Sequence, residues 1–175
     1  MGEPLERPVS NPSLELECVI DAWAETTDRW RAGLAGVSDE AVWWQPFRKS
    51  HSIGGILLHL ADVEGQWFEE GLRGTPRSEH ELEMVFGRAE RPPIGEWIEP
   101  PHWPLAQYFE VLDWIRVRSL AAIRRAGDPD HTFTGPDGPT TIAKAVRFMA
   151  YHEAYHAGQA MLHRLHFDWG GVEPA

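Results

Sequence analysis

The chain is poor in cysteine and in positive charge, and it has no long apolar run. One cysteine among 175 residues, Cys18, excludes an internal disulfide and fits a reducing cytoplasm. Lys and Arg number 16 against 27 acidic residues, a net charge of -11 that argues against a nucleic-acid partner. Charged residues or histidine interrupt every apolar stretch before the roughly 20 residues that cross a bilayer. We therefore expect a cytoplasmic protein with a small-molecule substrate and neither membrane nor nucleic-acid partners.

The N-terminal segment and the lone cysteine support the same expectation. Met1–Pro12 carries three prolines and acidic residues where a signal peptide would need a basic start and an apolar run. Cys18 stands among leucine, valine and isoleucine, so we expect it to be packed as a small hydrophobic side chain.

Apolar side chains recur at three- and four-residue steps in four long segments, which is typical of helices that bury one face. No alternation long enough for a strand is present, and residues 131–139 are predicted to form a turn between helices. The pattern predicts an all-α fold, a four-helix bundle that forms a single domain over residues 1–175. The expected helices are about 12–34, 52–72, 105–126 and from Thr140 or Thr141 to about 166, with one or two further turns at 38–44.

The stretch from Thr75 to Pro104 is rich in proline, glycine and charge. It should break any long regular element and form a long crossover loop between the second and third helices. Loops of this length in compact domains often carry function. Trp97 and Trp103 within it are expected either to cover a site or to anchor the loop.

The motif His-Glu-Ala-Tyr-His at residues 152–156 indicates a metal site. Residues four apart lie on one face of a helix, so the imidazoles of His152 and His156 project from consecutive turns and can share one ion. His59, near the margin of the apolar face of the second helix, is the best third ligand. Three imidazoles with an open position suit zinc, nickel or iron and can activate water or a thiol.

Alternatives remain for the residues of this motif. The histidines could instead be hydrogen-bonded structural or surface residues. Glu153 could be a general base, as in the zincin peptidases, or a residue that supports the site from behind the ligands. Gln159 could bond to a metal-bound water or cosubstrate, and a fourth ligand such as His163 would indicate a structural metal. The spacing after His156 does not match the metzincin pattern, which disfavours a peptidase.

Three stretches resemble the DinB/YfiT-like family: Trp30–Glu40, Ile53–Phe68 (IGGILLHLADVEGQWF) and His152–Gln159 (HEAYHAGQ). The resemblance covers most of the chain. It implies a four-helix bundle with a crossover after the second helix and a metal held by His59, His152 and His156. It also implies thiol-dependent S-transfer with bacillithiol or mycothiol. A non-catalytic metal-binding or stress-response protein and a metal-dependent hydrolase are the alternatives, and homodimerisation through a helix face is expected.

Overall fold

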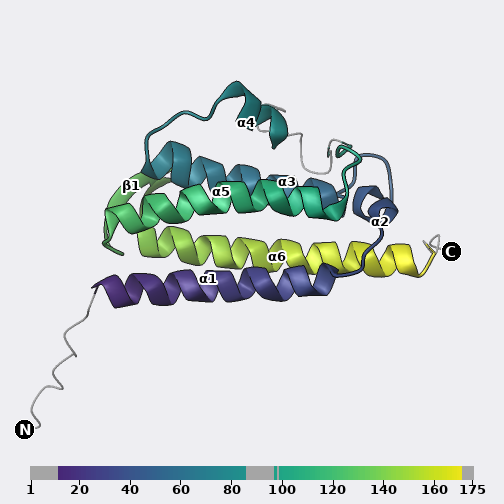
Figure 1. Ribbon diagram of the computed structural model, residues 1–175, viewed down its shortest axis with the longest axis horizontal. Helices are drawn as coiled ribbons and strands as arrows, with labels where there is room; N and C mark the ends of the chain where they lie inside the picture. The colour runs from purple at the N-terminus through teal and green to yellow at the C-terminus, as the bar shows by residue number, and fades with distance from the viewer. Residues whose placement is uncertain (1–11, 86–96, 98, 171–175) are drawn as a thin grey trace, which may run out of the picture.

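The computed structural model describes residues 12–85, 97 and 99–170. In this part of the chain, four long helical segments run alongside one another (Figure 1). The predicted all-α fold is confirmed, with one short hairpin as the only sheet in the described residues. None of the described helices is long and apolar enough to span a membrane. The four segments are α1 (Pro12–Leu34), α3 (Ile53–Gly65) continued by the π-helix η1 (Gln66–Leu72), α5 (Leu105–Ala126) and α6 (Ile142–Asp168).

The helices begin and end where the sequence carries capping signals. Ser38 caps the short helix α2 (Asp39–Trp43) by accepting a hydrogen bond from the amide of Ala41. Ser52 and Thr141 cap α3 and α6 in the same way. Such caps satisfy amide groups that the first turn of a helix cannot pair. Gly127 follows α5 at a φ of 70°, a left-handed conformation that favours glycine.

The long helices pack in pairs, α1 against α6 and α3 against α5, and α3 also contacts α6. Their apolar side chains form two clusters, one toward each end of the helices. The first cluster includes Leu34, Leu57 and Ile115, and the second includes Trp23 and Met149. In the second cluster, the first half of α1 packs against the first half of α6, so these two helices are parallel. The same cluster contains the second half of the α3–η1 segment, so that segment runs in the opposite direction.

Buried polar side chains lie between the two apolar clusters. Thr27, Glu64, Glu153 and His156 are each less than a tenth exposed, and each comes from the middle part of one of the four long helical segments. Buried polar groups are costly unless they have partners. This layer is therefore the part of the core in which a functional site is to be sought.

Three features differ from the expectations. Residues 131–139 do not form a simple turn, because strands β1 (Thr132–Gly135) and β2 (Gly138–Thr141) pair as an antiparallel hairpin. Its strands are too short to show alternation in the sequence. A short helix, α4 (Glu79–Met84), occurs in the crossover, and its capping box of Ser78 and Glu81 was the missed signal. Cys18 is exposed, not packed, because it lies off the buried face of α1.

Ion pairs attach the beginning of the crossover to the long helices. Arg118 on α5 bonds to Glu81 of α4 and, at 2.8 Å, to Glu69 of η1. Arg77, which is buried, lies 2.8 Å from Asp62 of α3. Hydrogen bonds from the Arg118 guanidinium and from Ser78 outweigh burial and lower the pKa of Glu81 to about 2. The crossover therefore starts in a fixed position against α3 and α5.

The end of the crossover is attached through Trp103. The indole of Trp43 donates a hydrogen bond of 2.6 Å to the Trp103 carbonyl oxygen. The Trp103 ring packs 5.4 Å from the ring of Tyr108, and the hydroxyl of Tyr108 donates to the carbonyl oxygen of Pro101. These contacts are those of an anchor, one of the two roles expected for the loop tryptophans.

Replacing Arg118→Met should lower the free energy of unfolding by about 2–3 kcal/mol. The reason is that Glu69, which is 1% exposed, would lose one of its two arginine partners. Chemical denaturation of both proteins would measure the difference. Arg124→Met is the matched control on the same helix, because Arg124 pairs with Glu17 at the exposed surface and its loss should cost under about 1 kcal/mol. Equal losses in the two variants would contradict the prediction.

Candidate metal centre

Three histidines from two helices meet in the polar layer. His59 comes from α3, and His152 and His156 come from α6. The Nε2 atom of His152 lies 3.2 Å from Nε2 of His59 and 3.1 Å from Nε2 of His156. All three ligand atoms lie within 4.8 Å of one another. The tertiary structure thus brings together the three residues that the sequence predicted as ligands.

This geometry fits a shared metal ion. Two nitrogens bound at 2.0–2.1 Å to one ion lie about 3.0 Å apart in octahedral geometry and about 3.4 Å apart in tetrahedral geometry. Hydrogen bonds alone do not explain the contacts of His152. One ring nitrogen either donates a single proton or offers a single lone pair, so Nε2 cannot bond fully to two other imidazoles. A cation between the three lone pairs satisfies all of them.

His156 is prepared for this role by its surroundings. Its Nδ1 lies 2.6 Å from Oε1 of Gln159, and an amide oxygen only accepts, so Nδ1 carries the proton and Nε2 offers its lone pair. Burial, together with the neighbouring His152, lowers the pKa of His156 to about 4. The amide nitrogen of Gln159 in turn donates to the Tyr155 hydroxyl at 3.3 Å. His156 is therefore a neutral imidazole in a fixed tautomer at neutral pH.

Aromatic rings surround the histidines. Phe148 stacks on His152 with ring centroids 5.5 Å apart, and Trp97 meets His59 edge-on at 5.3 Å. The Trp97 amide donates to the carbonyl oxygen of Lys49 at 2.7 Å, which ties this residue to the segment before α3. Trp97 thus lies against the site, as expected of a residue that covers it, whereas Trp103 lies at the anchor described above.

His163 is not part of the cluster. Among the described residues, the group that could hold a metal contains His59, His152 and His156 alone. The His163 ring lies near His51 and Trp44, with centroids 6.2 Å and 6.3 Å away. Burial and nearby histidines lower its pKa to about 4. The described residues therefore offer three protein ligands and leave further coordination positions to other molecules.

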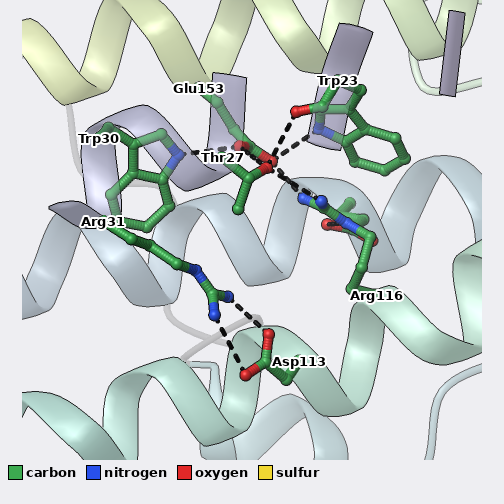
Figure 2. Close-up of polar contacts among 8 residues, drawn as sticks. Trp23, Thr27, Trp30, Arg31, Asp113, Arg116 and Glu153 are labelled. Carbon is green, nitrogen blue, oxygen red and sulfur yellow. Dashed lines mark hydrogen bonds and ion pairs between the residues drawn. The ribbon is translucent and has the colours of Figure 1, made fainter. Parts of the chain in front are cut away.

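The carboxylate of Glu153 is directed toward side chains of α1 and α5 (Figure 2). Its carboxylate accepts hydrogen bonds from the indoles of Trp23 and Trp30 at 2.7 and 2.9 Å and from the hydroxyl of Thr27 at 2.6 Å. Arg116 of α5 adds an ion pair. Both oxygens are thus engaged by protein donors. This placement fits a residue that supports the ligand helix, and it does not provide a free carboxylate for a general base.

Arg116 links Glu153 to a second buried carboxylate, Glu64 of α3. Its Nε lies 3.0 Å from Oε1 of Glu64, and its guanidinium carbon lies 3.6 Å from the centre of the Trp23 ring. Burial raises the pKa of Glu64, and Arg116 opposes this effect. The two carboxylates raise the pKa of Arg116 against the effect of burial. Glu64 thus has the cationic partner that a buried carboxylate needs.

Sequence reasoning did not find the donors around Glu153. Trp23 and Trp30 have the spacing of core residues, and their indole N–H groups give no signal in a hydrophobic pattern. Thr27 on the buried face of α1 was the visible clue, because a hydroxyl there needs a partner. Arg116 could have been sought as the partner that Glu64 requires.

The chain is mainly helical in its described residues, and it brings together three imidazoles that could hold a metal ion. The family model described as DinB superfamily matches residues 22–160. The chain therefore belongs to the DinB superfamily, as its sequence motifs suggested. No curated protein matches the chain. The family model spans all three histidines and all members of the Glu153 network.

Replacing Arg116→Leu should lower the free energy of unfolding at neutral pH by about 3–5 kcal/mol, because Glu64 would remain buried without its cation. The loss should shrink as the pH falls. Burial raises the pKa of Glu64 above its unfolded value, and the loss of Arg116 removes an effect that opposes this rise. As the pH falls, Glu64 of the folded variant therefore takes up its proton before Glu64 of the unfolded chain, and the variant regains stability.

Denaturation of both proteins over a range of pH would measure this effect. Arg31→Leu is the control: Arg31 of α1 forms a partly exposed ion pair with Asp113 of α5, 2.6 Å apart (Figure 2). The Arg31→Leu substitution should lower the free energy of unfolding by less than about 1 kcal/mol. If the stability lost in Arg116→Leu did not change with pH, the role of Arg116 as the cation that neutralises Glu64 would be contradicted.

Proposed function

We propose that this protein is a metal-dependent enzyme built on a DinB-type four-helix bundle, and that it transfers a group to the sulfur of a low-molecular-weight thiol such as bacillithiol or mycothiol. The observation that carries the proposal is the convergence of the Nε2 atoms of His59, His152 and His156 with no fourth protein ligand among the described residues. A closed structural site would normally supply four protein ligands.

The donor set suits thiol chemistry. A divalent metal held by three neutral imidazoles keeps its full charge and favours the thiolate form of a thiol at neutral pH. The ligand group contains no cysteine among the described residues, so the sulfur would come from a cosubstrate. Zinc, nickel and iron all match three imidazoles. Trp97 and Phe148 would provide apolar surface beside the reacting sulfur and limit access of water.

In this proposal, Gln159 and Glu153 are positioning residues. Gln159 holds His156 in the tautomer that presents its Nε2 lone pair. Glu153 fixes α6 against α1 and α5 through its four donors. Neither side chain needs to exchange a proton with the substrate. The proposal thus differs from a hydrolase that uses Glu153 as its base.

Metal content of the purified protein tests the site. One equivalent of zinc, nickel or iron should bind to the wild type, and His59→Ala and the double variant His152→Ala/His156→Ala should each lose at least about 90% of it, because two or fewer imidazoles remain. Mass spectrometry after dialysis would measure the ratio of metal to protein. His163→Ala is the matched control, another half-buried imidazole of α6 outside the cluster, and it should keep its metal. Metal that survives His59→Ala would refute the ligand set.

Thiol binding tests the reaction class separately from the metal site. Cobalt-loaded protein should develop a sulfur-to-metal charge-transfer absorption when bacillithiol or mycothiol is added, because the open position accepts a thiolate. The matched control is the same experiment with the hydroxyl analogue of the thiol, which should not produce the band. A cobalt spectrum that changes with neither thiol, in a protein whose melting temperature falls when metal is removed, would favour the non-catalytic alternative.

A further inference from the structure

The outer face of α6 carries a continuous apolar stripe. Its members follow one another at steps of four and three residues, the repeat with which one helix packs along another. The five side chains of the stripe are exposed by 41–68%. Its one gap, Gly158, has open space where a Cβ would stand. The stripe consists of Tyr151, Tyr155, Gly158, Leu162, Leu165 and Trp169.

This stripe is unusual for the surface of this protein. A quarter of the chain is charged, yet between Arg147 and Arg164 the only charged residue of α6 is Glu153, which is buried on the opposite side. Exposed apolar patches without charge are typical of interface centres. Three partly exposed aromatic rings alone present on the order of 400 Å² per molecule. Two such faces together approach the roughly 1,000 Å² of a small specific interface.

The order of residues in the stripe indicates its partner. The stripe is symmetric about Ala160: Tyr151 and Trp169 are equally far from this position, and so are Tyr155 and Leu165, and Gly158 and Leu162. A two-fold axis that crosses α6 near Ala160 would therefore pair each large residue with a large one at the ends. In the middle, the Leu162 side chain would fill the space above Gly158 of the other helix. Such self-complementarity is the property of an interface between identical chains.

We infer that α6 packs antiparallel against α6 of a second copy of this chain through this stripe. The interface adjoins the metal centre, because Tyr155 bonds to Gln159, which bonds to the ligand His156. A second copy would cover Tyr155 and exclude water from this chain of hydrogen bonds. The dimer is inferred from the exposure of the stripe residues and from their spacing along α6, so it does not depend on the proposed thiol chemistry.

Sedimentation velocity of the metal-loaded protein tests the inference. The wild type should be a dimer at micromolar concentration, at moderate salt that screens its charge of -11. Leu162→Glu should raise the dissociation constant at least about tenfold, because it places a carboxylate against apolar surface near the axis. Val117→Glu is the matched control, since Val117 is 68% exposed on α5, away from the stripe. Circular dichroism would verify that both variants are folded.

Three results would overturn the inference: a monomeric wild type, a dimer unaffected by Leu162→Glu, or equal dissociation of the Val117→Glu control. Cosedimentation of a monomeric wild type with phosphatidylcholine vesicles would assign the stripe to a membrane surface instead.

The antiparallel register has its own test. Tyr151→Lys and Trp169→Glu should each weaken the homodimer, and an equimolar mixture should form a heterodimer in which lysine faces glutamate. A parallel arrangement would place each residue opposite itself, so the mixture would form no lysine–glutamate pair, and mixing either variant with the wild type would recover as much affinity as mixing the two variants. Failure of the mixture to associate more tightly than the two single variants would overturn the antiparallel packing.

Discussion

The carboxylate of Glu153 is buried near the middle of α6, and the arrangement of the candidate metal centre depends on how it is held. A buried anion is stable only when donors surround it, and Trp23, Thr27, Trp30 and Arg116 supply them from α1 and α5. These donors leave α6 little freedom to slide or rotate. Because His152 precedes Glu153 and His156 follows it, the same bonds determine where both imidazoles stand opposite His59 on α3.

The polar layer also explains why the core is divided into two apolar clusters. The two clusters consist of apolar and aromatic side chains, and Thr27, Glu64, Glu153 and His156 are buried in the section between them. Arg116 joins the two carboxylates of this section, Glu64 and Glu153, and thereby connects α3, α5 and α6. Ligands that are held in place before an ion arrives bind it with less loss of conformational entropy. The contacts that stabilise the core therefore also hold the three histidines in place.

One helix serves three environments. Because α6 has about 3.6 residues per turn, adjacent residues of its central motif point in different directions. Glu153 faces the network with α1 and α5, and His152 and His156 face α3. Tyr151 and Tyr155 face outward and belong to the apolar stripe. Gln159 connects two of these environments, since it contacts both His156 and Tyr155. A change at Tyr155 on the outer surface of α6 therefore lies two hydrogen bonds from His156.

The sequence by itself determined the local structure of this protein. Periodicity and capping residues predicted α1 and α5 to the residue, and the four-residue spacing of His152 and His156 predicted that they share a helix face, because these are properties of short segments. Only the tertiary structure decided which side chains meet across the core. That Glu153 bonds to Trp23, Thr27, Trp30 and Arg116 depends on how α6 is rotated against α1 and α5. Hydrophobic spacing within one helix carries no information on the polar groups that a neighbouring helix presents.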